Sequence, residues 1–154
     1  NNSKLRLASH LPNATLPQPM SIPDHLLEVP GLRMTKQRKE VYRALMENRD
    51  HPTASEVFEQ MQQGEDTMSL ATVYNCLEAL VEHGAVKQVN IDREPSRYCP
   101  NLVEHGHFHD DTTGSIHDIN FKQGAKLTDF LELPEGTDIS GLEITIRGTL
   151  PKAT

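Results

Sequence analysis

The stretch Ser69-Leu-Ala-Thr-Val-Tyr-Asn-Cys-Leu-Glu-Ala-Leu-Val-Glu-His-Gly84 decides the fold that this sequence predicts. Its large apolar side chains recur every three or four residues, which is the spacing of one face of an α-helix. These side chains are Leu70, Val73, Leu77, Leu80 and Val81. Ser69 is a preferred residue for capping a helix start, and Gly84 suits the position just after a helix end. The stretch therefore predicts an amphipathic helix with a polar outer face.

Two further helices are predicted before this one. Thr35 can cap a helix that runs to about Asn48. Thr53 and Glu56 have the spacing of a capping box, in which each residue satisfies a backbone amide of the other. The helix that they begin ends at Gly64, a residue that commonly stops helices.

After the third helix the pattern changes from helical spacing to that of strands. A segment through Val86, Val89 and Ile91 leads to a turn at Asp92–Pro95, and Ser96–Cys99 returns. This pattern is typical of a two-stranded hairpin. Three helices followed by a hairpin predict a winged helix, which is a variant of the helix-turn-helix.

A second unit is predicted from Cys99 onward. Glu104–His109 alternates, Ser115–Phe121 returns after a turn, a short helix spans Ala125–Leu131, and Leu142–Arg147 forms a last strand. We therefore expect a small α/β unit with three strands. Its sheet has an unpaired edge, which a second copy of the chain would cover in a homodimer.

The predicted fold class is α+β, in three segments. Residues 1–22, rich in Pro, Asn and Ser, form a flexible arm, with a short helix predicted at Pro23–Glu28. Residues 23–98 form the winged-helix unit. Residues 99–154 form the α/β unit, which serves dimerisation and metal binding.

Composition limits the classes of function. The chain has 154 residues, 36% of them hydrophobic, so two small cores are favoured over one large core. The net charge of −7 argues against a protein that coats nucleic acid through bulk charge. With two cysteines and no apolar run long enough to span a membrane, we expect a cytoplasmic protein with reduced thiols.

The third helix has the side chains that a DNA-reading helix needs. Hydroxyl and amide groups lie away from its apolar stripe, and an Asn can pair with adenine. A basic cluster precedes the first helix, and the wing residues Arg93 and Arg97 add cationic groups for phosphates. The candidate DNA-binding residues are Arg33, Lys36, Arg38, Ser69, Thr72, Tyr74 and Asn75. The alternative is an ordinary three-helix bundle with a polar outer face.

A thiolate, imidazoles and a carboxylate lie within twenty residues of one another, at Cys99, His105, His107 and Asp118. Residues two apart in a strand share a face, so His105, His107 and His109 are expected to point the same way. Asp118, on the returning strand, can approach them across the turn. Such a donor set suits a first-row transition metal, and the thiolate favours zinc. The alternative is a solvated polar strand with accidental histidines.

His51 stands far from this group in sequence, in the loop before the second helix. Alone it would be a surface-loop histidine. A metal that joined His51 to the Cys99 group would tie the two units together and control their angle.

In order and spacing, these motifs resemble the ferric uptake regulator family of bacterial metal-dependent repressors. The resemblance runs from about Leu26 to Gly148, most of the chain. The matching stretches are Gly31-Leu-Arg-Met-Thr-Lys-Gln-Arg38, His51-Pro-Thr-Ala54, Ser69-Leu-Ala-Thr-Val-Tyr-Asn75, Ser96-Arg-Tyr98, His105-Gly-His107 and Ile116-His-Asp118.

The resemblance implies a winged helix followed by a dimerisation domain, with one regulatory divalent metal per subunit held between them. It places the ligands at His51, Cys99, His105, His107 and Asp118. It also implies a homodimer that binds a palindromic double-stranded operator and represses metal-uptake genes, and a protein that is not an enzyme. Metal binding would select the orientation in which two recognition helices match two half-sites.

The ligand set mixes features of two branches of the family. The peroxide-sensing branch has Asp in place of Cys99. The zinc-sensing branch has Cys there, with the same spacing, but it draws a further ligand from the wing, where this chain has Ala85, Lys87 or Gln88. The resemblance therefore leaves the metal open between iron, zinc and manganese.

The family usually has two Cys-x-x-Cys pairs that hold a structural zinc. Here the corresponding positions are Asp110, Thr113, Leu150 and Ala153, so we expect no structural four-cysteine zinc and a domain stabilised by packing. Gly106 likewise occupies a ligand position of a secondary site found in some relatives.

Two rival functions belong to other classes. A small cupin-type metalloenzyme also uses His-x-His with a carboxylate, but residues 85–154 provide too few strands for it. A helix-turn-helix module for protein interaction would need no metal.

Overall fold

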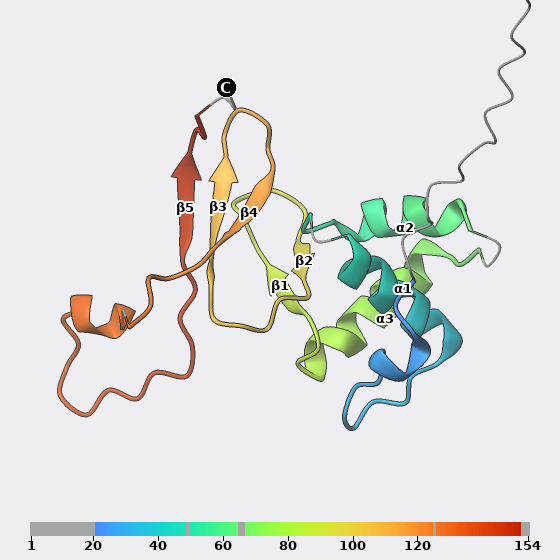
Figure 1. The fold of residues 1–154 in the computed structure, drawn as a ribbon, viewed down its shortest axis with the longest axis horizontal. Coiled ribbons are helices and arrows are strands. Elements are labelled where there is room, and N and C mark those ends of the chain that lie inside the picture. Colours follow the sequence, from blue (N-terminus) through green and yellow to red (C-terminus); the bar gives the residue numbers. More distant parts are fainter. Residues whose placement is uncertain (1–20, 49, 65–66, 125, 152–154) are drawn as a thin grey trace, which may run out of the picture.

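The computed structural model describes residues 21–48, 50–64, 67–124 and 126–151. A helical unit on one side faces a β-rich unit on the other, as Figure 1 shows. The helices are α1 (Lys36–Glu47), α2 (Ala54–Gln62) and α3 (Leu70–Glu82), with short 3₁₀ helices at Asp24–Leu26 and Leu127–Phe130. The strands are β1 (Lys87–Val89), β2 (Arg97–Cys99), β3 (Gly106–Asp110), β4 (Ile116–Ile119) and β5 (Thr145–Gly148).

The three predicted helix caps are present. The hydroxyl of Thr35 accepts a hydrogen bond from the amide of Arg38 at the start of α1. Thr53 and Glu56 form the reciprocal capping box of α2. Ser69 caps α3 by accepting from the amide of Thr72. Because each cap satisfies amides that have no partner inside the helix, local sequence alone sets where these helices begin.

The helical unit has one apolar core, to which α1, α2 and α3 all contribute. Its fully buried side chains include Leu27, Val41, Leu45, Val57, Val73, Leu77 and Leu80. Leu70, predicted to lie on the apolar stripe of α3, is 37% exposed, and Cys76 is buried in the stripe instead. Gly84 follows α3 with a φ of 69°, the left-handed conformation that favours glycine at a helix end.

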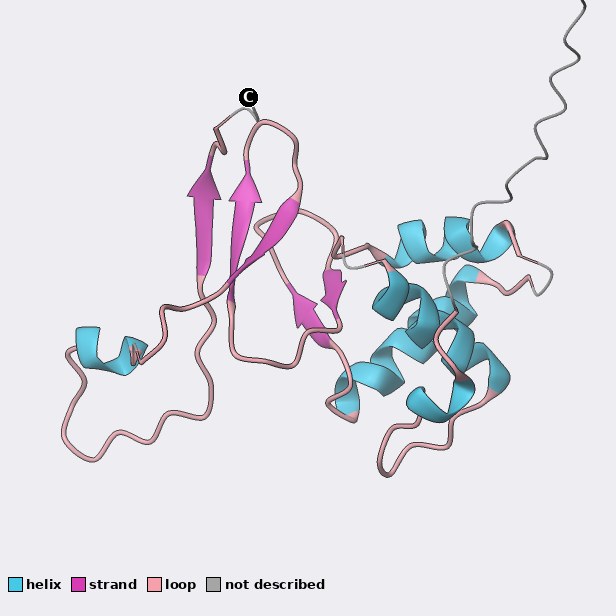
Figure 2. Cartoon of the chain, in the orientation of Figure 1, coloured by secondary structure: helices cyan, strands magenta, loops and turns pink. Residues whose placement is uncertain are grey.

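The wing is an antiparallel hairpin of β1 and β2, in which Gln88 pairs with Tyr98. The amide of Tyr98 donates to the carbonyl of Pro52, so β2 is attached to the loop before α2. Figure 2 shows the hairpin between the helices and the second sheet. The winged-helix architecture predicted from the sequence is confirmed.

The second sheet has the strand order β4-β3-β5. β3 pairs antiparallel with β4, which places His107 opposite Asp118, and parallel with β5. The predicted last strand, Leu142–Arg147, begins later, at Thr145. The predicted helix at Ala125–Leu131 is a 3₁₀ turn at Leu127–Phe130, and Ala125 lies outside the described residues.

Two predictions concern the start of the chain. The predicted arm, residues 1–22, lies outside the described part of the chain except for its last two residues. Ile22 is anchored there, since its amide donates to Glu47 and its carbonyl accepts from Arg43. The predicted helix at Pro23–Glu28 is a single 3₁₀ turn without a side-chain cap.

A small second core lies where the wing meets the second sheet. It contains Val89, Ile91, Cys99 and Ile116, all of them buried. Cys99 therefore combines a place in this packing with a place at the predicted metal site. No helix in the described ranges is long and apolar enough to cross a membrane.

Candidate metal centre

The five predicted ligands come from separate parts of the chain. His51 lies in the loop between α1 and α2, Cys99 ends β2, His105 precedes β3, His107 lies in β3 and Asp118 lies in β4. One donor atom from each residue can be chosen so that all five lie within 4.8 Å of one another. The structure therefore brings together side chains from the helical unit, the wing and the second sheet.

His105 and Asp118 lie at the centre of this cluster. Nε2 of His105 lies 3.0 Å from Nε2 of His107 and 3.5 Å from Sγ of Cys99. Oδ1 of Asp118 lies 3.2 Å from Nε2 of His105 and 2.8 Å from Nε2 of His51. Imidazole nitrogens, a sulfur and a carboxylate oxygen, all of which carry lone pairs, thus converge on one small volume.

Neighbouring groups orient these donors. Nδ1 of His105 lies 2.6 Å from the carbonyl oxygen of Val103, which assigns the proton to Nδ1 and leaves the lone pair of Nε2 facing the cluster. The amide of Asn101 donates to Oδ2 of Asp118 at 2.7 Å, leaving Oδ1 for the cluster. The orienting roles of Asn101 and Val103 were not predicted from the sequence, because the only hint of them there is that both residues lie close to Cys99.

His51 is held in a costly conformation. Its φ is 52°, in the left-handed region that a residue with a β-carbon rarely adopts, and its carbonyl accepts from Nη1 of Arg97 at 3.1 Å. Strain of this kind persists where the surroundings fix it, often at functional sites. Here it directs an imidazole that is 2% exposed into the cluster.

Burial sets the protonation of the cluster. It lowers the pKa of His51 and, together with the charges of His51 and His105, lowers the pKa of His107 to about 4. Burial raises the pKa of the Cys99 thiol. For Asp118 burial acts in the opposite direction, but the Asn101 hydrogen bond and the imidazoles outweigh it and lower the pKa. At neutral pH His51 and His107 are neutral, and Asp118 is ionised.

The residues present fit a transition metal. Both ring nitrogens of His51 are buried and lack an aligned hydrogen-bond partner, although Nε2 is close to Asp118. Burying such polar atoms is costly unless something binds them. Neutral imidazoles, a carboxylate and a thiol are together a ligand set for zinc, iron or manganese.

Two other histidines of the region do not join the cluster. His109 was expected to share a face with His105 and His107, yet its Nε2 lies 3.4 Å from Oε1 of Glu94 in the wing turn. Its Nδ1 lies 3.4 Å from Oδ1 of Asp111. His117 is exposed and pairs with Phe108, in keeping with its exclusion from the ligand set.

The candidate DNA-binding residues lie on the helical unit. Tyr74 and Asn75 are exposed on α3, and Ser69 and Thr72 lie at its first turn, with their hydroxyl oxygens 2.9 Å apart. Arg33, Lys36 and Arg38 lie at the start of α1, where Arg38 donates to the carbonyl of Arg33. The predicted phosphate contact by Arg97 is not favoured by the structure, since that guanidinium bonds to His51 and Glu56.

The sequence is similar to those of known proteins. A model of the ferric uptake regulator family matches residues 30–147, most of the chain. The chain belongs to the ferric uptake regulator family. The peroxide-responsive repressor PerR of Staphylococcus aureus (strain Mu50 / ATCC 700699) is 32% identical over 93 residues, which cover 60% of this chain and 63% of that protein. The match thus spans less than two thirds of the length of that family member.

Solved structures share the fold. The peroxide stress regulator of Campylobacter jejuni is 29% identical, with a TM-score of 0.62 over 77% of this chain and 88% of that chain. The iron-bound ferric uptake regulator of Francisella tularensis is 21% identical, with a TM-score of 0.64 over 80% of this chain and 96% of that chain. The second of these two structures was solved with iron.

Proposed function

We propose that this protein is a metal-responsive repressor that binds a palindromic operator as a homodimer and controls genes of metal uptake or homeostasis. Membership of the ferric uptake regulator family supports the class of function. The observation that carries the proposal is the convergence of five donors from both units of the chain.

The proposed ligands are His51, Cys99, His105, His107 and Asp118, and they hold one iron, zinc or manganese ion per subunit. When bound, the metal supplies a positive charge and directional bonds that the donors cannot supply to one another. His51 and Cys99 belong to the helical unit and its wing, whereas the other three belong to the second sheet. Their shared site therefore favours one angle between the units.

The proposed DNA-binding surface is the exposed side of α3 with the start of α1. Asn75 offers an amide that pairs with a base edge, and Tyr74 and Thr72 offer hydroxyls. Arg33, Lys36 and Arg38 place positive charge beside them, as contact with phosphates requires. The chain as a whole is acidic, and only this local cluster attracts DNA. Its DNA affinity therefore depends strongly on the spacing of the two copies of this surface in the dimer.

The proposed homodimer is supported by apolar side chains that the second unit leaves exposed. Phe130 is 81% exposed and Ile146, on the edge strand β5, is 48% exposed. Large apolar side chains gathered on one unit are typical of an interface. A twofold dimer presents two copies of α3, as a palindromic operator needs.

The test is operator binding with and without metal. A duplex is first selected from randomised DNA with the manganese-loaded protein, and its affinity is then measured by fluorescence anisotropy with Mn²⁺, Fe²⁺, Zn²⁺ or chelator. We expect chelation to weaken binding by about tenfold to a hundredfold, the usual range of coupling between two sites.

His107→Ala should show the same weak binding with and without metal. His117→Ala is the matched control, because it removes an exposed imidazole from the adjacent strand without touching the cluster. Equal operator affinity of the wild type in metal and in chelator would contradict the metal response and favour metal-independent DNA binding. Failure to select any duplex would contradict DNA binding itself.

A further inference from the structure

His51 has a backbone conformation that its own sequence disfavours. Its φ is 52°, in the left-handed region where a β-carbon is crowded by the backbone. Pro52 follows it, and the residue before a proline is pushed toward extended backbone with φ about −120°. Two local preferences therefore oppose the conformation that directs this imidazole into the donor cluster, and contacts from elsewhere in the chain must hold it.

Strand β2 supplies those contacts. Nη1 of Arg97 donates to the carbonyl oxygen of His51 at 3.1 Å. The amide of Tyr98 donates to the carbonyl oxygen of Pro52 at 3.0 Å. Arg97 also forms a single antiparallel bridge with Thr53. Two consecutive carbonyls of the loop are thus fixed, which sets the orientation of the peptide that joins His51 to Pro52.

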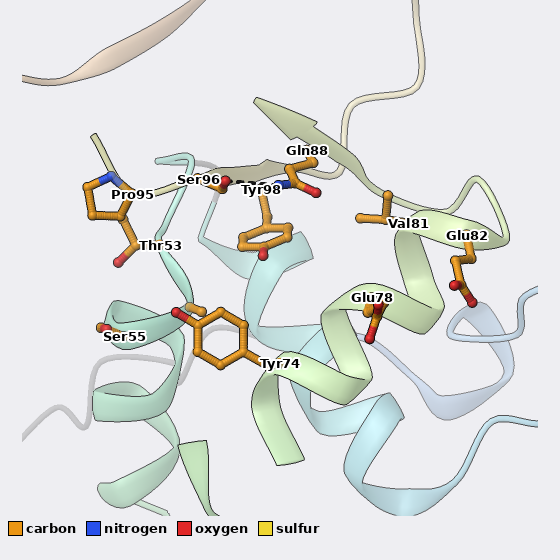
Figure 3. A pocket seen from close by; sticks show the side chains of 11 residues that line it. Thr53, Ser55, Tyr74, Glu78, Val81, Glu82, Gln88, Pro95, Ser96 and Tyr98 are labelled. Atoms are coloured by element: carbon orange, nitrogen blue, oxygen red, sulfur yellow. Dashed lines mark hydrogen bonds between the residues drawn. The ribbon is translucent and has the colours of Figure 1, made fainter. Parts of the chain in front are cut away.

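The strand is itself held in place by its hairpin. Nε2 of Gln88, on β1, donates to Oγ of Ser96 at 2.8 Å, as the dashed line in Figure 3 marks. Figure 3 also shows Thr53, the cap of α2, beside Pro95 and Ser96. Arg97 follows Ser96 in the chain, so its side chain reaches the loop from a base that is fixed on both sides.

The contact with His51 is the one that accounts for an arginine at this position. Nη1 of Arg97 also lies 3.4 Å from Oε2 of Glu56, but the Glu56 side chain is 53% exposed, and an ion pair open to water stabilises little. Nε of Arg97 is buried and has no hydrogen-bond partner among the described residues, which is unfavourable. Stability alone therefore does not favour this guanidinium, whereas a charged donor suits a carbonyl that must be held firmly.

We propose that Arg97 is a positioning residue for metal binding. By holding the carbonyl of His51, it keeps the loop in the conformation that directs the imidazole into the donor cluster. Cys99 lies two residues further along β2, so one strand places two of the five donors relative to each other. This role rests on the metal binding proposed above, and it gives the guanidinium a function other than the phosphate contact that the sequence predicted.

Cobalt serves as the probe, because its absorption spectrum reports its ligands. Full-length protein is titrated with Co²⁺ against a competing chelator, and a thiolate-to-cobalt charge-transfer band shows that Cys99 binds. Arg97→Met keeps the aliphatic stem of the side chain and removes its donors. We expect the cobalt affinity to fall by about tenfold to a hundredfold, as is usual when a group that orients a ligand is lost. The thiolate band should persist, while the visible d–d bands change because His51 is no longer held in place.

A double-mutant cycle shows whether Arg97 acts through His51. His51→Ala should weaken cobalt binding, and adding Arg97→Met to it should have no further effect, because the ligand to be positioned is already gone. Arg97→Gln, whose side chain is too short to make the contact of Nη1, is a second variant that should behave as Arg97→Met does in both backgrounds. Lys122→Met is the control for charge, since it removes an exposed positive charge from the segment after β4, and its cobalt affinity should match that of the wild type.

Two results would overturn the role of Arg97. One is wild-type cobalt affinity in an Arg97→Met protein whose circular dichroism shows the native fold, or in Arg97→Gln if the first variant does not fold. The other is an equal loss of affinity in the presence and in the absence of His51, which would show that Arg97 acts on the fold in general. A wild type without a thiolate-to-cobalt band would instead contradict the proposed metal site, so the two failures are distinguished.

Discussion

At the scale of single residues, we expect Cys99 to control how the metal affinity of the proposed site depends on pH. Burial raises the pKa of its thiol, so the proton is present at neutral pH and must leave when the thiolate binds a metal. His107, with a pKa of about 4, has already lost its proton. Release of one proton makes the apparent metal affinity rise by about tenfold between about pH 7 and about pH 8, as competition with a chromophoric chelator would measure.

Cys99→Asp is the matched control, because a carboxylate is ionised throughout this range. We expect the variant to bind metal with little dependence on pH between the same two values. A slope as steep in Cys99→Asp as in the wild type would show that the proton comes from another group, and it would remove the thiolate from the proposed ligand set.

At the scale of elements, the side chain of Asp110 stabilises the β3–β4 turn, at a position where the family resemblance implied a zinc-binding cysteine. Asp110 is buried, and its two carboxylate oxygens accept from the amide of Thr112 at 2.9 Å and the hydroxyl of Thr113 at 3.0 Å. Asp110→Ala leaves both donors without this partner, so we expect the thermal midpoint to fall by roughly 2–4 °C. Circular dichroism of the metal-free protein would measure it.

Ser115→Ala is the control for this turn, because the amide of Asp110 bonds to the backbone carbonyl of Ser115 and the Ser115 side chain is exposed. Its thermal midpoint should match that of the wild type. If Asp110→Ala were as stable as Ser115→Ala, the hydrogen bonds of Asp110 would not contribute measurably to the stability of this turn.

The elements that sequence predicted well are those set by local interactions. Thr53 and Ser69 act on amides two or three residues away, so their helix starts could be predicted from neighbours alone. The start of β5 depends instead on pairing with β3, a contact between residues far apart in the chain. Such pairing leaves little signal in the segment itself, which is why the predicted strand at Leu142–Arg147 began too early.

The candidate site shows the same contrast between features set by local sequence and features set by distant contacts. The alternation of side chains along a strand predicted that His105 and His107 approach each other. The pairing of strands in a hairpin predicted that Asp118 lies beside them. Strand alternation could not predict that Glu94 in the wing turn draws near His109. Nor could sequence explain Gly106, where a β-carbon would lie 3.2 Å from the carbonyl oxygen of Ile144 and would crowd its neighbours.

At the scale of the whole molecule, the two units also touch beyond the donor cluster. Ile116 of β4 packs with Val89 and Cys99 of the wing, and His109 of β3 approaches Glu94 of the wing turn. These contacts are few, so the angle between the units rests on a small core and on the donor cluster. A metal bound to the cluster would therefore stabilise an orientation of the two units that packing already favours. Metal binding would then increase the population of this orientation rather than create it.

The proposed dimer gives the last prediction, and Phe130 is the residue that tests it. This side chain is 81% exposed on the second unit, which is unfavourable in water but suits the centre of an interface. Phe130→Ser should raise the dimer dissociation constant by about tenfold or more in sedimentation equilibrium, because truncating a buried aromatic anchor commonly costs at least that much binding. Leu26→Ser, which alters a side chain 60% exposed on the helical unit, should leave the dimer intact. A Phe130→Ser protein that remains as dimeric as Leu26→Ser would place the interface elsewhere, and a wild type that sediments as a monomer at operator-binding concentrations would contradict the twofold arrangement.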